Sequence, residues 1–166
     1  MKRRTALTAI SAALLLAFAA PVAAQSAKSL VGTWQIVSTE NVDPSGKTTQ
    51  PMGANPQGQL IFTPNGRYSL TLARSDLPKF AANSRDKGTA AENQAVVAGS
   101  IAHSGRYSVD EKEKSFTYHP EASTYPNWLG TSQKRVFTVS GDELRYTNPV
   151  GSAGGQRVDL VWKRVQ

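Results

Sequence analysis

The sequence predicts an all-β protein, an eight-stranded antiparallel up-and-down barrel with a helical insertion between strands three and four. Three observations predict this fold. Short runs of alternating apolar and polar residues recur along the chain, short turn-forming segments join most of them, and one long segment lacks the alternation. Short connections indicate an antiparallel meander, and closure into a barrel removes exposed strand edges. An open sandwich is the alternative.

The first residues are expected to lie outside the fold. A basic start at residues 2–4, an apolar run over 6–20 and small residues up to Ala24 predict a secretory signal peptide over residues 1–24. The apolar run is short for a membrane span, and no second run follows it. We therefore expect a single barrel domain over residues 25–166, periplasmic or secreted, with no membrane span after signal cleavage.

Composition narrows the classes of function. The 166 residues include 19 Lys and Arg against 12 Asp and Glu, and the net charge of +7 falls to +4 once the signal peptide is removed. No basic stripe with interleaved aromatic residues remains, so a nucleic-acid partner is not expected. Because the chain contains no cysteine, it has no disulfide and no thiolate metal site. We expect no cofactor.

The first three strands are predicted over residues 32–38, 59–63 and 67–72. Asn65-Gly66 separates the second from the third, and this dipeptide favours a hairpin because both residues tolerate positive φ. On the first strand, the side chains expected to face inward are Trp34, Ile36 and Ser38. On the third strand, the inward side chains are Tyr68, Leu70 and Leu72.

The long segment over residues 73–100 is predicted to be largely non-strand. Thr89 and Glu92 form a capping-box pattern at the start of a helix over residues 90–98, and residues 75–78 resemble another short helix start. An insertion of this length between strands often covers a functional surface.

Strands then resume with the same alternation. The fourth to eighth strands are predicted over residues 101–109, 115–119, 133–139, 143–147 and 157–165. Pro120 and Pro126 argue against regular pairing, so residues 121–128 are predicted to be a loop at the barrel mouth that carries Trp128. In this loop Trp128 would either cap the cavity entrance or plug the barrel from below.

An ordered series of motifs along the chain resembles that of bacterial lipocalin-like domain proteins, which belong to the calycin-type barrels. Gly32-Thr33-Trp34 on the first strand is followed by further matches at residues 55–60, 65–69, 98–100, 105–109, 126–130, 133–137 and 141–144. The resemblance spans residues 30–165. It implies a barrel with an apolar cavity, and it implies no single activity because members of such a fold differ in function.

Two residues at one end of the barrel are expected to be structural. In a closed meander the last strand pairs antiparallel with the first, which brings Arg164 close to Trp34. A guanidinium over an indole ring is favourable, and the pair would plug one end of the barrel.

Polar residues on the inward faces are the candidates for ligand binding. Arg135 shares an inward face with Phe137, and Gln133 shares it too. A buried cation needs a partner. One interpretation is that Arg135 anchors a ligand anion with help from Gln133. The other is an internal ion pair with Glu121 or Asp159, or a bulge that turns the side chain outward.

His103 and Tyr107 share a face and are the candidates for acid–base catalysis, although nothing identifies a reaction. Tyr68, Tyr118 and Trp128 complete the predicted ligand-binding set. Two distant histidines without a metal-ligand spacing predict no metal site.

The leading hypothesis is an exported barrel that binds a small hydrophobic or amphipathic molecule. The alternatives are an enzyme that uses the same cavity, such as an isomerase, cyclase or hydrolase, and a packed barrel that acts as an envelope or interaction protein.

Overall fold

Antiparallel strands follow one another in the sheet order β2-β1-β3-β4-β5-β6-β7-β8-β9, and β9 pairs again with β1. The computed structural model describes residues 26–152 and 154–166, so the expected signal peptide over residues 1–24 lies outside the described residues. The strands are β1 (Gly32–Val42), β2 (Thr48–Thr49), β3 (Gln57–Phe62), β4 (Arg67–Ala73), β5 (Ser100–Asp110), β6 (Ser115–Ser123), β7 (Gln133–Ser140), β8 (Glu143–Asn148) and β9 (Arg157–Arg164). The helical elements are α1 (Ala27–Leu30), η1 (Arg85–Lys87), α2 (Ala90–Gly99) and η2 (Pro126–Trp128).

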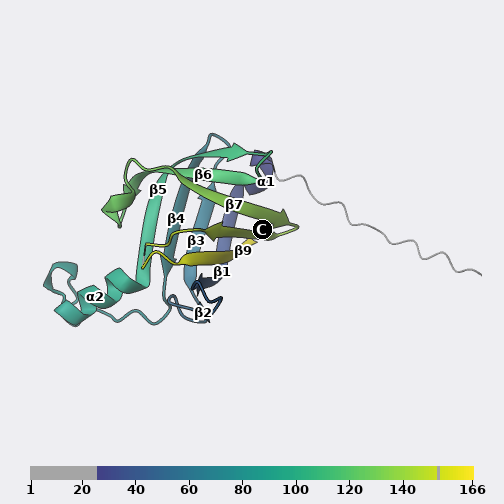
Figure 1. Ribbon diagram of the computed structural model, residues 1–166. Helices are drawn as coiled ribbons and strands as arrows, with labels where there is room; N and C mark the ends of the chain where they lie inside the picture. The colour runs from purple at the N-terminus through teal and green to yellow at the C-terminus, as the bar shows by residue number, and fades with distance from the viewer. Residues whose placement is uncertain (1–25, 153) are drawn as a thin grey trace, which may run out of the picture.

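The barrel is closed by pairing between its first and last strands. β1 and β9 are paired from Trp34 opposite Arg164 to Val42 opposite Arg157. β2 is a two-residue strand added to the end of β1, which leaves eight strands around the barrel. Figure 1 shows the barrel with α1 and α2 at opposite ends. The predicted fold class is confirmed, and the open sandwich is excluded because the sheet closes on itself.

The helical insertion lies between β4 and β5, as predicted. Thr89 caps α2 by accepting a hydrogen bond from the Glu92 backbone N–H, and the Glu92 carboxylate accepts one from the Thr89 N–H. The second expected helix start, over residues 75–78, is wrong: this segment is a turn. The Asp76 carboxylate bonds the Arg74 guanidinium at 2.7 Å, so it does not cap a helix that follows.

A β-bulge in β1 changes which of its side chains face the interior. The register with β9 shifts between Ile36 and Ser38. Beyond this shift Thr39 and Asn41 are buried, and Val37 is half exposed. The expectation that Ser38 faces inward with Trp34 and Ile36 is therefore wrong, because an extra residue on one strand reverses the alternation that follows it.

β6 continues past Pro120, which was expected to end it. It runs to Ser123, with a register shift against β5 that leaves Glu121 as the extra residue between Pro120 and Ala122. β7 pairs with β6 only up to Tyr118, so Pro120 lies where β6 lacks a partner strand on that side. A side chain at Gly105 would collide with the carbonyl oxygen of His119, which shows how closely the two strands approach at the bulge.

One end of the barrel is filled by packed side chains beneath α1. Trp34 is fully buried and donates a hydrogen bond from Nε1 to the Leu30 carbonyl at 2.8 Å. The Arg164 guanidinium lies 4.0 Å from the Trp34 ring centroid and donates to the carbonyls of Val31 and Ser29 at 2.8 Å each. The predicted contact between Trp34 and Arg164 is present, and together with α1 it closes this end. Besides Trp34, the fully buried aromatic side chains of the core are Phe62, Phe116, Tyr118, Phe137 and Trp162.

Candidate functional site

The other half of the barrel encloses a cavity of about 530 Å³. Its wall is formed by the inward side chains at one end of the strands, and its opening lies between α2 and the loop that contains η2. The aliphatic side chains of the wall are Leu70, Leu72, Ile101, Val158 and Leu160 from the barrel, with Val96 and Val97 from α2 and Met52 from the β2–β3 loop. The barrel is therefore hollow at one end and packed at the other, which excludes the hypothesis of a completely packed interior.

Aromatic side chains form a continuous row along one side of this cavity. Tyr125 meets Trp128 edge to face with ring centroids 5.5 Å apart, and Trp128 meets His103 in the same way at 5.3 Å. His103 in turn meets Tyr118 at 5.3 Å. We call Tyr125, Trp128, His103 and Tyr118 the aromatic row; it leads from the mouth of the cavity to its floor.

Trp128 lies at the mouth of the cavity. It ends the 3-10 turn η2, which the β6 extension and Pro126 place beside the barrel opening. Its indole is half buried and packs against His103 and Tyr125 on the cavity wall. Of the two placements predicted for this residue, the structure shows the cap over the entrance rather than the plug from below.

Arg135 is a buried cation without a carboxylate partner among the described residues. Its side chain lies on the cavity wall, and the residue is 5% exposed. Nη1 donates to the Lys134 carbonyl at 2.9 Å and Nη2 donates to Gln133 Oε1 at 2.7 Å, which leaves the remaining N–H groups of the guanidinium available. Burial lowers the pKa of Arg135, although a guanidinium stays charged in proteins.

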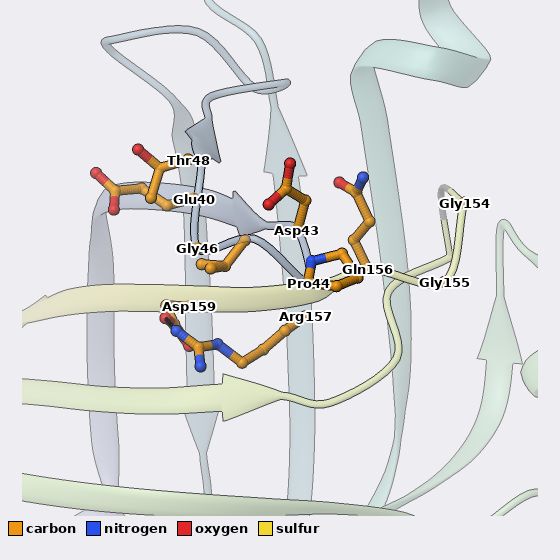
Figure 2. A pocket seen from close by; sticks show the side chains of 11 residues that line it. Glu40, Asp43, Pro44, Gly46, Thr48, Gly154, Gly155, Gln156, Arg157 and Asp159 are labelled. Carbon is orange, nitrogen blue, oxygen red and sulfur yellow. Dashed lines mark hydrogen bonds and ion pairs between the residues drawn. The ribbon is translucent and has the colours of Figure 1, made fainter.

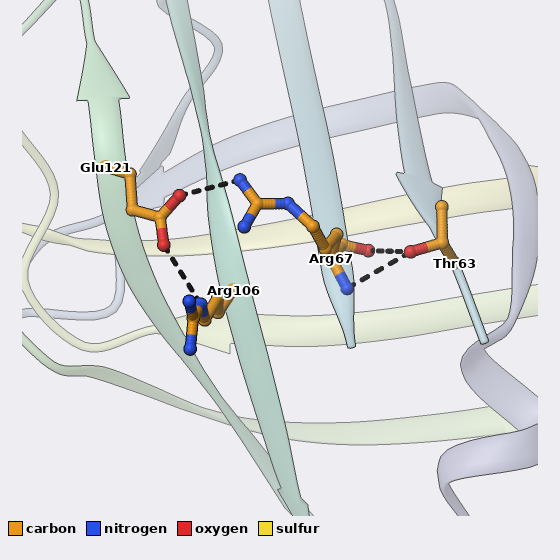
Figure 3. A network of polar contacts seen from close by, with 4 residues as sticks. All are labelled: Thr63, Arg67, Arg106 and Glu121. Atoms are coloured by element: carbon orange, nitrogen blue, oxygen red, sulfur yellow. Dashed lines mark hydrogen bonds and ion pairs between the residues drawn. The ribbon is translucent and has the colours of Figure 1, made fainter. Parts of the chain in front are cut away.

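The acids that were expected to pair with Arg135 are occupied elsewhere. Glu121 bridges Arg67, at 2.6 Å, and Arg106, at 3.1 Å, in the polar network that Figure 3 shows. Asp159 bonds Arg157 at 2.9 Å and accepts from the Thr147 hydroxyl at 2.8 Å. The interpretation as an internal ion pair is therefore wrong. The alternative of an outward-turned side chain is wrong too, because β7 keeps Arg135, Phe137 and Val139 on one buried face.

His103 lies next to this cation in a neutral form. The residue is 7% exposed, and its Nδ1 lies 2.8 Å from the Tyr68 hydroxyl. Burial, and secondarily the charge of Arg135, lowers the pKa of His103 to about 4. At neutral pH the imidazole therefore carries no charge. Tyr68 is not part of the cavity wall, but its hydroxyl hydrogen-bonds to His103, which is.

Two tyrosines form the floor of the cavity beside Arg135. The Arg135 guanidinium lies 5.9 Å from the Tyr118 ring centroid. The Tyr118 hydroxyl lies beside that of Tyr146 but not in hydrogen-bond geometry, and it has no hydrogen-bond partner among the described residues. Burial raises the pKa of Tyr118 well above its ordinary value and that of Tyr146 to about 12, so both phenols are protonated donors at neutral pH.

The structure brings together only part of the predicted site. His103, Tyr118, Trp128 and Arg135 line the cavity, and Gln133 orients Arg135 from outside the wall. Tyr107 is elsewhere: it packs edge to face on Phe62 with centroids 4.8 Å apart and donates its hydroxyl to the Thr63 carbonyl at 3.0 Å. His103 and Tyr107 share a face of β5, as expected, but Tyr107 lies toward the packed end, so the two do not form an acid–base pair in one cavity.

Sequence reasoning missed the polar residues that line the cavity on β1 and β8. Thr39 and Asn41 lie on its wall, as does Asn148, and all three are buried. Simple alternation along β1 predicts that Ser38 faces inward. The bulge at Val37 shifts the alternation by one residue, so Thr39 faces inward instead. The signal that could have found them is the unbroken strand-like run from Gly32 to Val42, which is long enough to reach the cavity end.

A second hollow of about 890 Å³ lies on the outer surface, between the β1–β2 hairpin and the β8–β9 turn. Figure 2 shows its polar lining, which includes Glu40, Asp43, Arg157 and Asp159. It is open to solvent, Asp43 accepts hydrogen bonds from its own turn at Ser45, and Asp159 bonds Arg157. We therefore regard the smaller enclosed cavity as the candidate site.

The described part of the chain offers neither a metal site nor a membrane-spanning helix. No group of three or more His, Asp or Glu side chains in it is suited to hold a metal ion. No helix in residues 26–152 or 154–166 has the length and apolar character needed to cross a membrane.

A closed antiparallel barrel with one packed end and one hollow, mainly apolar end belongs to the class of barrels that enclose a small molecule. A family model described as "Lipocalin-like domain" matches residues 31–165. The chain belongs to this lipocalin-like domain family.

One curated relative and several solved structures are similar to this chain. The 4'-hydroxy-3'-methoxypropiophenone carrier protein ppsC of Aspergillus oryzae is 30% identical over 106 residues, which cover 58% of this chain and 96% of that protein. Fatty-acid-binding protein 1 of Echinococcus granulosus has a TM-score of 0.39 at 15% identity, over 84% of this chain and 99% of that chain. A fatty acid binding protein of Schistosoma mansoni in complex with arachidonic acid has the same TM-score and identity, over 85% and 99%. The assignment of the barrel rests on the strand order rather than on these distant likenesses.

Proposed function

We propose that this chain is an exported carrier that holds one small, largely apolar molecule inside its barrel. The observation that carries the proposal is the enclosed cavity of about 530 Å³, whose wall is mainly aliphatic and aromatic. Sites for small organic molecules commonly measure about 300–1,000 Å³ and combine an apolar wall with a few polar groups that fix orientation. Arg135 and His103 are polar groups of this kind on the cavity wall.

One relative supports a carrier rather than an enzyme. The Aspergillus oryzae relative is, by its name, a carrier of a small aromatic ketone, and it aligns with this chain over nearly its whole length. The cavity of this chain holds one buried cation and one neutral histidine, and Tyr107 contributes nothing to it. A barrel that shields an apolar molecule from water needs no catalytic pair.

The proposal includes export to the periplasm or beyond. The basic start, apolar run and small-residue site over residues 1–24 support it. Expression of the full chain in a Gram-negative host followed by intact-mass measurement of the periplasmic fraction tests it. The mass expected is that of residues 25–166, and recovery of the uncleaved chain only from the cytoplasm would contradict export.

Ligand binding is tested with an environment-sensitive fluorophore. Anilinonaphthalene sulfonate is expected to bind the wild-type protein at one site with a blue-shifted emission. Ile101→Trp fills the cavity from β5 and is expected to abolish this signal. The matched control is Val136→Trp, because Val136 is 59% exposed and faces outward from the neighbouring part of the barrel. Unchanged fluorophore binding by Ile101→Trp would show that the cavity is not the binding site.

Native mass spectrometry of protein purified from the periplasm complements this test. The expected result is a co-purifying small molecule that is lost on denaturation, and its mass would identify the natural ligand.

A further inference from the structure

The shape of the cavity limits what its ligand can be. Each of β1, β4, β8 and β9 contributes two inward residues to the wall, such as Leu70 and Leu72 on β4. Two residues along a strand span roughly 7 Å, so the chamber below the mouth is shallow. Phe116, Phe137 and Leu144 are almost fully buried and are not part of the cavity wall, so the interior beyond the chamber is packed. A long extended chain would have to fold back on itself to fit.

The two sides of the chamber differ in chemistry. The aromatic row presents ring edges and faces from the mouth to the floor, whereas β4, β9 and α2 present aliphatic side chains. Edge-to-face contact between aromatic rings stabilises by about 0.5–1.5 kcal/mol beyond the area that it buries. An aromatic ligand can make edge-to-face contacts with the aromatic row and apolar contacts with the aliphatic side. A saturated chain can make only apolar contacts.

The polar groups of the chamber favour an anion at its floor. The Arg135 guanidinium lies on the cavity wall and has N–H groups without partners among the described residues. No ion pair among the described residues includes Arg135. Leaving a buried charge unpaired is costly, and an oxygen anion would both neutralise it and accept hydrogen bonds from its free N–H groups.

We infer that the ligand is a compact organic anion with an aromatic ring, held by its carboxylate or phenolate oxygen on Arg135 and by its ring against the aromatic row. This inference rests on the proposed carrier function and names the class of ligand. Gln133 acts as a positioning residue, because its Oε1 accepts from Nη2 and holds the guanidinium toward the chamber.

Four probes of related size test the class of ligand by isothermal titration. Naphthylacetate is the ring-containing acid, naphthylacetamide is its neutral isostere, naphthylethylamine is its cationic counterpart, and dodecanoate is a linear acid with the same number of carbon atoms. We expect naphthylacetate to bind most tightly, at least about 10-fold more tightly than the amide, and the amine to bind least. Dodecanoate is expected to bind more weakly than naphthylacetate because it makes no ring contacts.

Arg135→Gln tests how much the charge of Arg135 contributes to ligand binding. It is expected to weaken naphthylacetate binding by about 10- to 100-fold and to change naphthylacetamide binding by less than about 3-fold, because only the acid loses a charge-assisted bond. Arg145→Gln is the control, since Arg145 lies on the outer surface of β8 and pairs there with Glu143. It should leave both affinities unchanged.

The outcomes distinguish this inference from the proposed function. If dodecanoate binds as tightly as naphthylacetate, or if the amide matches the acid in the wild-type protein and in Arg135→Gln, the carrier function stands and the ligand class is wrong. If no probe binds the wild-type protein and anilinonaphthalene sulfonate does not bind either, both are wrong.

Discussion

Two arginines, one at each end of the barrel, show how differently the two halves of this molecule are built. Arg164 lies over the Trp34 ring and donates to two backbone carbonyls of the segment around α1. Arg135 is more deeply buried, yet it has one carbonyl and one amide oxygen as partners and no carboxylate among the described residues. The first arginine completes the closed end, and the second leaves unsatisfied donors at the cavity.

The difference indicates that the closed end provides stability and the open end provides binding. In a packed interior, polar groups that are hydrogen-bonded within the protein stabilise the fold. In a binding cavity, polar groups that stay unpaired for a ligand lower the stability of the free protein. The following predictions test this division, beginning with the largest expected effect.

Trp34→Ala should destabilise the protein most. Trp34 is fully buried, bonds Leu30 and supports Arg164, so its removal leaves a large hole at the closed end. We expect the free energy of unfolding, measured by urea denaturation, to fall by about 3–5 kcal/mol. Val37→Ala, at the half-exposed bulge of the same strand, should change it by less than about 0.5 kcal/mol. Similar losses for the two variants would show that the closed end is not the stabilising half.

The open end should make stability depend on pH through His103. Its pKa is about 4 in the folded protein and 6.5 in its unperturbed form, so the unfolded chain binds a proton first as the pH falls. The free energy of unfolding should therefore decline as the pH falls below 6.5 and level off near pH 4. The total decrease that His103 contributes should be roughly 3 kcal/mol.

His103→Gln is the variant that isolates this effect. Denaturation at several pH values should give a flatter profile between pH 6.5 and 5, where exposed carboxylates such as Glu121 still remain ionised. A profile as steep as that of the wild-type protein would assign the pH dependence to another group.

Arg164→Met should lower the free energy of unfolding by about 2 kcal/mol. The substitution keeps much of the apolar stem but removes the bonds to Val31 and Ser29 and the contact with the Trp34 ring. Thermal unfolding followed by circular dichroism measures the change, and fluorophore binding at the other end should be unaffected. Weaker fluorophore binding without a loss of stability would contradict the division between the two ends.

Trp128→Ala should have the smallest effect on stability and a visible effect on binding. Its indole is half buried and covers the cavity mouth through contacts with His103 and Tyr125. We expect the affinity for naphthylacetate to fall by about 3- to 10-fold, mostly through faster dissociation in stopped-flow measurements. Leu129→Ala, an exposed neighbour in the same loop, should leave dissociation unchanged.

The closed end could be predicted from the sequence in more detail than the open end. Period-two alternation located the eight barrel strands, and antiparallel closure placed Arg164 beside Trp34. The errors arise at irregularities that alternation does not reveal. The bulge at Val37 moves Thr39 and Asn41 inward, and the bulge at Glu121 lets β6 continue past Pro120.

The state of Arg135 depended on tertiary contacts that no local pattern shows. The sequence placed its side chain inward, but Glu121 pairs with Arg67 on β4, which is distant in sequence, and Asp159 pairs with Arg157 on its own strand. Only the assembled barrel shows that Glu121 and Asp159 are both paired on its outer surface. Arg135 inside the barrel therefore has no carboxylate partner among the described residues.

The most direct test of the division between the two ends is to measure unfolding of Arg135→Met beside that of Arg164→Met by urea denaturation without ligand. Replacing a buried ionic group with an apolar side chain of similar size is often neutral or stabilising by about 1–4 kcal/mol. We expect Arg135→Met to be as stable as the wild-type protein or more stable, and to lose affinity for naphthylacetate, while Arg164→Met loses stability. A loss of stability in Arg135→Met as large as that in Arg164→Met, with its affinity retained, would contradict the account.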